Sequence, residues 1–226
     1  MRGRTPALTF HFHKVGDWEW IRNHLGYFGS LTRTTLYIAL VAVLLGLLVA
    51  LALGVLAVRV PRAYEPILAV TTILYAVPSL AVFGFLVGVT GLTDNTVILP
   101  LGAYGLAILF RSVTDGLTSV AEEVRISATA MGYGPLRRLV SVELPAAVPV
   151  IVGGLRVATV ASISLMTVGA LIGIGGLGQL FTAGENTDFV TEIGAGIVIV
   201  ALVALVLDGL LLLAGRLLTP WARTSR

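Results

Sequence analysis

The sequence predicts an all-α membrane protein that crosses a lipid bilayer about five times. Of its 226 residues, 57% are hydrophobic and only 12% are charged, whereas soluble domains carry about 25% charged residues. Several apolar runs approach the roughly 20 residues that a helix needs to span the hydrocarbon core. The basic residues behind the net charge of +3 are scattered between these runs. Such scattering is typical of membrane topology signals and not of a nucleic-acid-binding face.

The N-terminal region, residues 1–31, is the least apolar part of the chain. An irregular tail is one interpretation of it. The other is an amphipathic helix at the membrane interface, whose aromatic residues lie at the level of the lipid headgroups. These aromatic residues are Trp18, Trp20, Tyr27 and Phe28. His11 and His13 resemble half of a metal site, but no third ligand is near them, and no metal site is predicted.

A transmembrane domain is expected over residues 32–220, followed by a short C-terminal tail of residues 221–226. Its first apolar run contains no charged residue and is long enough to cross the bilayer at about 1.5 Å per residue. Pro78 is expected to kink the second span, because a proline leaves a backbone carbonyl without its donor. The five expected spans cover residues 36–58, 66–89, 97–114, 146–172 and 193–213.

The Lys and Arg residues of the loops predict the orientation of the spans. If the polar loop of residues 115–145 is cytoplasmic, nine arginines lie on the cytoplasmic side and none lies in the two external loops. Five basic residues before the first span are the one discordance. The prediction is an external N-terminus and a cytoplasmic C-terminus. The cytoplasmic arginines are Arg59, Arg62, Arg111, Arg125, Arg137, Arg138, Arg216, Arg223 and Arg226.

Enzyme chemistry is not predicted for this chain. It has no cysteine, which excludes disulfides, thiolate catalysis and cysteine-ligated metals. Gly173, Gly175 and Gly178 match the G-x-G-x-x-G pattern of dinucleotide-binding proteins, but that pattern needs a βαβ unit, and here an apolar span precedes it. A turn just outside the membrane is the better interpretation. No set of serine, histidine and aspartate falls within the spans.

Arg156 and Asp208 are the two charged residues deep inside the expected spans. Arg156 lies about 16 Å into the fourth span from the cytoplasmic side, and Asp208 lies about 12 Å into the fifth span from the same side. An unpaired charge at such a depth costs several kcal/mol. The similar depths favour a structural ion pair between the two helices, and a role in a transport path is the alternative.

Residues 119–145 form the longest polar interruption in the apolar part of the chain. Ser119 and Glu122 have the spacing of a capping box, in which a serine and a glutamate satisfy the first N–H groups of a helix. Glu123 adds a second negative charge to the first turn, where the helix dipole favours it. A helix is therefore expected to begin here.

This helix can continue to Met131 and stop at Gly132. Pro135 is expected to start a second short helix, because proline suits the first helical turn, and Pro145 is expected to end it. The result is an elbow of two helices on the cytoplasmic surface.

The second half of this elbow resembles a motif in the membrane subunits of bacterial ABC importers. The motif reads EAA, three residues, Gly, nine residues, Ile, one residue and Leu-Pro, and the same spacing here links Gly132 to Val142 and Pro145. Residues 126–128 occupy the EAA positions, where two small residues fit and Ile126 replaces the glutamate. An acidic residue one helical turn earlier could take over its polar contact.

Two glycine-rich stretches extend the resemblance. GGLRVATV (153–160) and GALIGIGGLGQ (169–179) are similar to the osmoprotectant branch of these importers, which takes up glycine betaine, choline and related quaternary amines. The likeness covers roughly residues 30–220. Methionine permeases share the five-span plan and a related loop. A permease for another small solute therefore stays open, as does a membrane scaffold protein without transport activity.

The resemblance implies a type I ABC importer permease whose elbow is a coupling helix that docks on cytoplasmic ATPase subunits. Two permeases, identical or different, would pair in the bacterial plasma membrane, and an external binding protein would deliver the solute. The chain would bind no cofactor, because ATP and Mg²⁺ would be used by the ATPase, and no nucleic acid is expected as a partner. The residues expected at the ATPase are Glu122, Glu123, Ser127, Ala128, Met131, Gly132, Tyr133, Leu136, Leu144 and Pro145.

The path through the membrane would need aromatic faces for a quaternary ammonium group, because such a group has no hydrogen-bond donor. Tyr75 and Phe83 in the second span are candidates for this contact, with packing against lipid or core as the competing interpretation. The full set of residues expected along the path is Tyr75, Pro78, Ser79, Phe83, Ser162 and Thr167.

Overall fold

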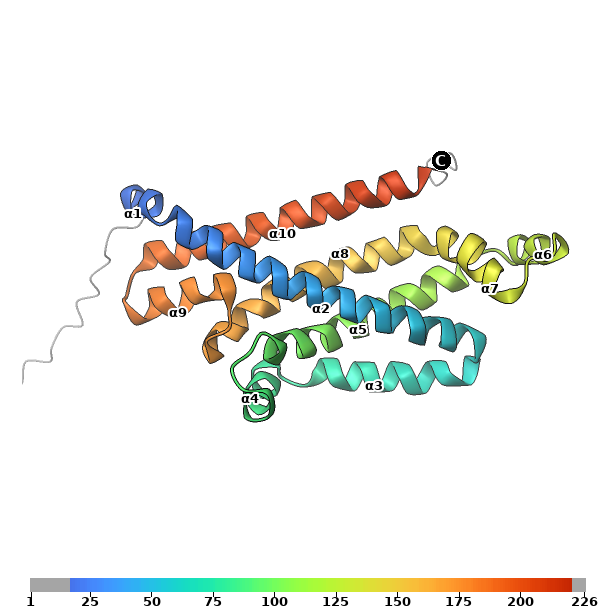
Figure 1. Cartoon of the computed structure of the whole chain (residues 1–226), viewed down its shortest axis with the longest axis horizontal. Helices are drawn as coiled ribbons and strands as arrows, with labels where there is room; N and C mark the ends of the chain where they lie inside the picture. The colour runs from blue at the N-terminus through green and yellow to red at the C-terminus, as the bar shows by residue number, and fades with distance from the viewer. Residues whose placement is uncertain (1–16, 221–226) are drawn as a thin grey trace, which may run out of the picture.

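The computed structural model describes residues 17–220, which form a bundle of long helices with short helical segments at both ends (Figure 1). Every regular element in this range is helical. The α-helices are α1 Trp18–Asn23, α2 Leu25–Arg59, α3 Tyr64–Ala76, α4 Ser79–Thr90, α5 Asn95–Thr118, α6 Glu122–Ala130, α7 Pro135–Arg138, α8 Leu144–Val168, α9 Gln179–Asn186 and α10 Val190–Leu218. Short 3₁₀ turns cover Pro61–Ala63, Gly169–Ile172 and Gly176–Gly178, and a π-helical turn covers Leu139–Glu143.

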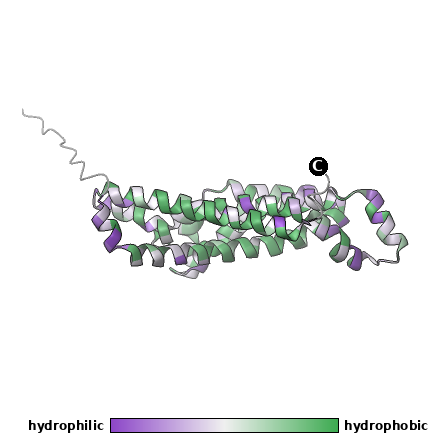
Figure 2. Cartoon of the chain, turned by 90° about the horizontal axis from the view of Figure 1, so that it is seen from above, coloured by the Kyte–Doolittle hydropathy of each residue, from purple (hydrophilic) through white to green (hydrophobic). Residues whose placement is uncertain are grey.

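The all-α, membrane-spanning fold class is confirmed. In the described range, four helical segments are long and apolar enough to cross a membrane, and one bent pair makes a fifth candidate. The four are α2, α5, α10 and the continuous segment that contains α8, and the bent pair is α3 with α4. Hydrophobic residues dominate the middle of the bundle, and hydrophilic residues gather toward its ends (Figure 2).

The first span begins much earlier than residue 36, because α2 starts at Leu25 and runs for 35 residues. Part of the expected interfacial tail therefore belongs to this long helix. Two of its aromatic residues pack inside the bundle: Trp20 lies against the ring of Phe189, with 5.0 Å between centroids, and Phe28 is only 6% exposed. The position of the aromatic residues at the level of the lipid headgroups stays a prediction. Trp18 and Tyr27 are exposed. His11 and His13 lie outside the described residues.

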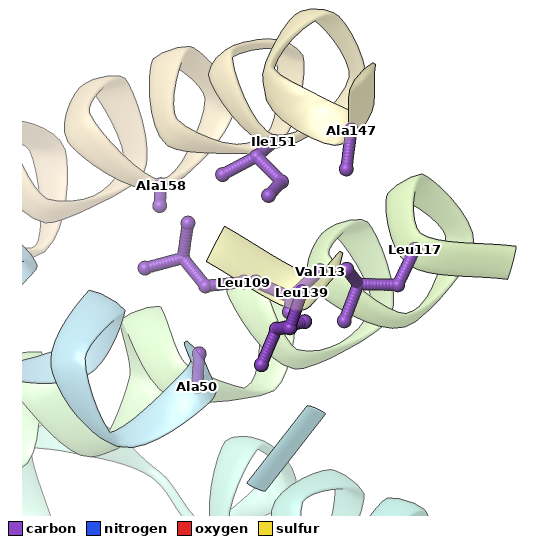
Figure 3. Packing of buried hydrophobic residues seen from close by; sticks show 8 residues of the cluster. All are labelled: Ala50, Leu109, Val113, Leu117, Leu139, Ala147, Ile151 and Ala158. Atoms are coloured by element: carbon purple, nitrogen blue, oxygen red, sulfur yellow. The ribbon is translucent and has the colours of Figure 1, made fainter. Parts of the chain in front are cut away.

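Helix α5 is the centre of the bundle and packs against both α2 and α8. Small residues allow this close approach: a Cβ atom added to Gly46 would lie 2.8 Å from the carbonyl oxygen of Gly102. Such packing is the usual way for helices to associate in lipid, where apolar burial provides little driving force. One buried cluster joins the three helices to the elbow (Figure 3) and consists of Ala50, Leu109, Val113, Leu117, Leu139, Ala147, Ile151 and Ala158.

The second span is broken into α3 and α4, which meet at an angle of 89°. A kinked but continuous helix over residues 66–89 was expected. Pro78 has no N–H to donate to the carbonyl of Leu74, which accepts the N–H of Val77 at 3.4 Å instead. Val77 is extended, with a ψ of 132°, as a residue before proline prefers. The two effects together end one helix and start another.

The glycine-rich turn after α8 packs against α2. Gly173 and Gly176 have φ values of 85° and 48°, which glycine adopts most readily. The hydroxyl of Thr35 accepts the N–H of Leu177 at 2.9 Å and donates to the carbonyl of Leu31 at 3.0 Å. The G-x-G-x-x-G pattern therefore serves a packed turn between helices, and the described residues around it form no βαβ unit.

An ion pair joins α8 to α10. Nε of Arg156 donates to Oδ1 of Asp208 at 2.7 Å, and Nη2 donates to Oδ2 at 2.6 Å. Two parallel bonds of this kind fix orientation as well as distance. The apolar middle of α10 is little covered, whereas Ala195, Ile199 and Val203 nearer its start pack against a buried cluster. The pair therefore acts together with these contacts to fix how α10 is rotated against α8.

Adjacent glycines on α8 provide a matched test of the helix packing. A Cβ at Gly154 would overlap with the Cβ of Ser112 on α5, whereas Gly153 faces open space. We expect Gly154→Ala to destabilise the detergent-extracted protein by about 1–3 kcal/mol through overpacking. Gly153→Ala should be neutral or slightly stabilising, because alanine is the better helix former. Equal melting temperatures for the two variants would show that α5 and α8 do not pack this closely.

The pair of Arg156 and Asp208 predicts non-additive losses of stability. Either single alanine substitution leaves one charge without its partner at membrane depth, which the apolar surroundings disfavour. The double variant should cost little more than either single variant, because it removes both charges. A double-mutant cycle on thermal unfolding in detergent measures the coupling, and strictly additive losses would contradict it.

Candidate functional site

The elbow, residues 119–145, projects from the end of the bundle opposite α1 and α9 (Figure 1). Its first helix, α6, ends at Ala130, close to where the sequence predicts a stop. Gly132 follows with a φ of 83°, a conformation that residues with side chains rarely adopt. The N–H groups of Gly132 and Tyr133 bond to the carbonyls of Thr129 at 2.9 Å and Ala128 at 3.1 Å. Gly132 thus closes the helix and turns the chain toward α7.

Two details of the elbow differ from the prediction. Ser119 does not cap α6; its hydroxyl donates to the carbonyl of Gly116 at 2.8 Å, because α5 continues to Thr118. Ala121 precedes α6 without a side-chain cap. Pro145 does not end a helix, since α7, the π-helical turn and α8 form one continuous segment. Pro145 lies in the first turn of α8, just after the wider π-helical turn, where its missing N–H is tolerated.

A buried carboxylate holds the elbow to the bundle. The side chain of Glu143 is 5% exposed, and its Oε1 accepts a hydrogen bond from Nε of Arg138 at 2.8 Å. Its Oε2 lies 3.9 Å from Nη2 of Arg59, at the end of α2. Arg59 also donates to the carbonyl of Pro135 at 3.1 Å, and Arg138 donates to Oγ1 of Thr129 at 2.9 Å. We call these five residues the Glu143 cluster; it links α2, α6, α7 and α8.

Sequence reasoning did not assign a function to Glu143. The carboxylate pairs with Arg138, five residues earlier, whereas helical ion pairs are expected three or four residues apart. The π-helical turn between them provides the longer spacing. A usable signal was the single acid in the mostly apolar stretch LVSVEL, because a buried carboxylate has to be paired.

Most residues expected at an ATPase lie on the outside of the elbow. Glu122, Glu123, Ser127, Met131, Gly132 and Leu136 are exposed, Tyr133, Leu144 and Pro145 are half-buried, and Ala128 is buried. Met131 and Leu136 are 69% and 73% exposed. Ile126, at the position of the motif's glutamate, is 60% exposed. The elbow therefore presents an outer face at these positions on which acidic and polar side chains mix with large apolar ones.

A cavity of about 320 Å³ lies between α6 and the start of the continuous helix, and its lining includes Glu122, Arg125, Thr129 and Arg138. Arg125 donates to the carbonyl of Leu117 at 2.6 Å and lies 3.8 Å from Glu122. Its Nε is buried and has no hydrogen-bond partner in the described chain. Arg125 thus keeps one N–H group without a partner in the described chain, and the cavity beside it has a polar lining.

Three of the six path candidates gather at the break between α3 and α4. Tyr75, Pro78 and Ser79 line a cavity of about 240 Å³ together with Tyr104 of α5. Phe83 is fully buried in a core cluster and does not line this cavity. Phe83 therefore follows the competing interpretation, packing in the core, because the 89° bend points α4 in a new direction. Tyr104, which sequence reasoning did not select, provides the second aromatic ring that lines the cavity.

The remaining two path candidates lie elsewhere on α8. Ser162 is 2% exposed and packs inside the bundle. Thr167 is half-buried, and its hydroxyl donates to the carbonyl of Ser164 at 2.7 Å. The six candidates therefore do not form one continuous lining. Among residues 17–220, no group of three or more histidines and carboxylates could hold a metal ion.

Sequence comparison relates the chain to transport proteins. Residues 26–224 match the family described as the binding-protein-dependent transport system inner membrane component. The chain is 34% identical over 207 residues to the osmoprotectant import permease protein OsmW of Salmonella typhimurium. This alignment covers 89% of this chain and 96% of that protein. It is 37% identical over 179 residues to the glycine betaine/carnitine/choline transport system permease protein OpuCD of Bacillus subtilis, covering 79% and 78% of the two chains.

Structural comparison finds a solved transporter chain with a similar fold. A chain from an inward-facing structure of the MetNI methionine ABC transporter superposes with a TM-score of 0.67 at 21% identity, over 84% of this chain and 93% of that one. At this identity the likeness shows the fold alone. The family match covers almost the whole chain. The protein therefore belongs to the family of binding-protein-dependent transport system inner membrane components.

Proposed function

We propose that this chain is the membrane-spanning permease subunit of an ATP-driven importer for small quaternary amines such as glycine betaine and choline. The observation that carries the solute class is the 34% and 37% identity, over most of both chains, to permeases named for osmoprotectants, glycine betaine, carnitine and choline. A methionine permease is the alternative, and its support is a likeness of fold at 21% identity.

The elbow is the proposed contact with a cytoplasmic ATPase subunit. Its exposed Met131 and Leu136 offer apolar area to a partner, and burying one such side chain contributes roughly 1.5–3 kcal/mol. The cavity beside α6 offers polar lining residues, among them Glu122 and Arg138, for pairing with polar groups of that partner. The sequence lacks the GK[ST] end of a phosphate-binding loop, which supports ATP hydrolysis in a separate subunit.

The Glu143 cluster is the proposed link between docking and the membrane helices. Its bonds join α6 and α7 of the elbow to α2 and to the start of α8. A buried and hydrogen-bonded ion pair holds its partners in one geometry, because breaking it leaves an uncompensated charge. Displacement of the elbow by a closing ATPase would therefore move the ends of α2 and α8 together.

The orientation and the other partners follow from the same proposal. The elbow faces the cytoplasm, as the distribution of arginines supports, and the turn near Gly173 faces an external binding protein. The exposed apolar side of α10 meets lipid or a second permease. ATP with Mg²⁺ is used by the ATPase, and this chain supplies the path and the coupling surface.

Reconstituted transport tests the proposal. The permease, its ATPase and its binding protein are placed in liposomes with ATP inside or outside as the orientation requires. Uptake of labelled glycine betaine or choline is expected, with no uptake of labelled methionine. Methionine uptake would support the alternative solute. Absence of any co-purifying ATPase would contradict a permease function and favour a scaffold protein.

A charge on the outer face of the elbow should abolish docking. We expect Leu136→Asp to weaken co-purification of the ATPase at least tenfold, because a carboxylate replaces an apolar contact worth roughly 1.5–3 kcal/mol. Membrane insertion should be normal, since Leu136 is 73% exposed. Thr118→Asp, at an exposed position at the end of α5, is the control and should dock normally. Unchanged docking of the Leu136 variant would place the ATPase elsewhere.

Neutralising Glu143 should loosen the elbow. We expect Glu143→Gln to lower the stability of the extracted permease by about 1.5–3 kcal/mol, because it removes the charge from a buried side chain that pairs with two partly exposed arginines. Glu122→Gln removes an exposed pairing at 3.8 Å and should cost less than about 0.5 kcal/mol. Thermal unfolding of both variants checks this, and equal losses would show that Glu143 holds nothing. At a temperature where the Glu143 variant is folded, solute transported per ATP should also fall.

A further inference from the structure

The cavity at the break between α3 and α4 lies deep in the apolar part of the bundle. Helix α3 has 13 residues, so the break lies about 20 Å from its first residue, in a hydrocarbon core roughly 30 Å thick. Irregular backbone at such a depth is tolerated where it is buried in protein or lines a water-filled cavity. The residues that line it include Tyr75, Val77, Pro78, Ser79, Tyr104 and Leu165.

Two tyrosine rings form one corner of this cavity. The rings of Tyr75 and Tyr104 are nearly perpendicular, at 88°, with 6.0 Å between their centroids. The hydroxyl of Tyr104 donates to the carbonyl of Val77 at 2.9 Å, which holds its ring in place and uses its donor. Tyr75 is 50% exposed, and Tyr104 is 5% exposed. The corner therefore consists of one fixed ring and one accessible ring.

The chemistry of the lining favours a cation without N–H groups. No Asp, Glu, Lys or Arg lines the cavity, so a primary ammonium would lose its water without gaining a carboxylate. A quaternary ammonium has no N–H donor, and aromatic faces attract it by about 0.5–2 kcal/mol. The carbonyl end of α3 also points its partial negative charge toward the break.

The size of the cavity agrees with a small solute. Its volume of about 240 Å³ corresponds to about eight water molecules. Sites for drug-sized ligands are larger, at about 300–1,000 Å³. The modest attraction expected from one or two rings also suits a transport path, where a solute has to leave as readily as it enters.

We propose that this cavity binds the quaternary ammonium head of the solute during its passage, with Tyr75 as the accessible ring and Tyr104 as the fixed wall. The inference rests on the proposed function, because it places the proposed solute class at one point in the membrane. Tyr75 contributes its ring face and not its hydroxyl. Tyr75→Phe should therefore retain the site, and Tyr75→Leu should lose it.

Thiol labelling tests the site without requiring transport. The chain has no cysteine, so Ser79→Cys places a single thiol of this chain in the cavity. Two thiol reagents of equal size are compared on the assembled importer in lipid nanodiscs, one with a trimethylammonium head and one with a neutral tert-butyl head. Phe85→Cys is the control, because Phe85 is 74% exposed on α4 outside the cavity.

We expect the ratio of cationic to neutral labelling rates to be about tenfold higher at Ser79→Cys than at Phe85→Cys. Excess choline should slow labelling at Ser79→Cys only. The tenfold preference should disappear when Tyr75→Leu is added and persist when Tyr75→Phe is added. Ala76→Cys, also in the lining, replaces Ser79→Cys if that variant does not fold.

Three results would overturn the proposal that the cavity binds the ammonium head. They are equal ratios at the two cysteines, a preference that survives Tyr75→Leu, and labelling that choline does not slow. Faster labelling by the neutral reagent would identify a lipid-filled groove and would also overturn it. Uptake by the wild-type importer reports on the proposed function separately, so a failure of the site and a failure of the function give different outcomes.

Discussion

Each polar group within the apolar body of this chain needs a partner from the chain itself, because lipid supplies none. Thr35 on α2 meets this demand by accepting the N–H of Leu177 from the turn after α8. Arg156 and Asp208 meet it across α8 and α10. In both cases the partner lies on a different element. Satisfying the polar groups therefore also determines how the helices are placed, and small residues then allow the backbones to close the remaining distance.

The same constraint divides the molecule into tightly and loosely joined parts. Helices α2, α5 and α8 share one buried cluster, and Leu139 of the elbow belongs to it (Figure 3). The Glu143 cluster adds polar bonds between the elbow and the ends of α2 and α8. The second span, by contrast, is interrupted by the extended Val77 and by Pro78. A force on the elbow would thus move α2 and α8 as a unit, while the break offers the chain a place to bend.

Sequence reasoning succeeded where a signal depended on local pattern. The apolar runs are long, so the number of spans could be predicted from their lengths. The pairing of Arg156 with Asp208 could be predicted because the two residues lie at similar distances from the cytoplasmic ends of their helices. It failed where the outcome depended on where a neighbouring helix ends. The capping pattern at Ser119 was misassigned because α5 reaches Thr118. For Phe83, core packing was the competing interpretation, and Phe83 does pack in a core cluster because the break at Pro78 redirects α4.

Ile126 shows how the elbow can depart from its family motif and still support a strong contact. A hydrogen bond to the motif's glutamate would contribute about 1.5–3 kcal/mol, and full burial of an isoleucine contributes a similar amount. Ile126 is 60% exposed, so that area is available to a partner. Glu122, one turn earlier, is held near Arg125 and remains beside the cavity. In the proposed docking, the substitution exchanges a directional contact for an apolar one of similar strength, and it calls for an apolar surface on the ATPase at this point.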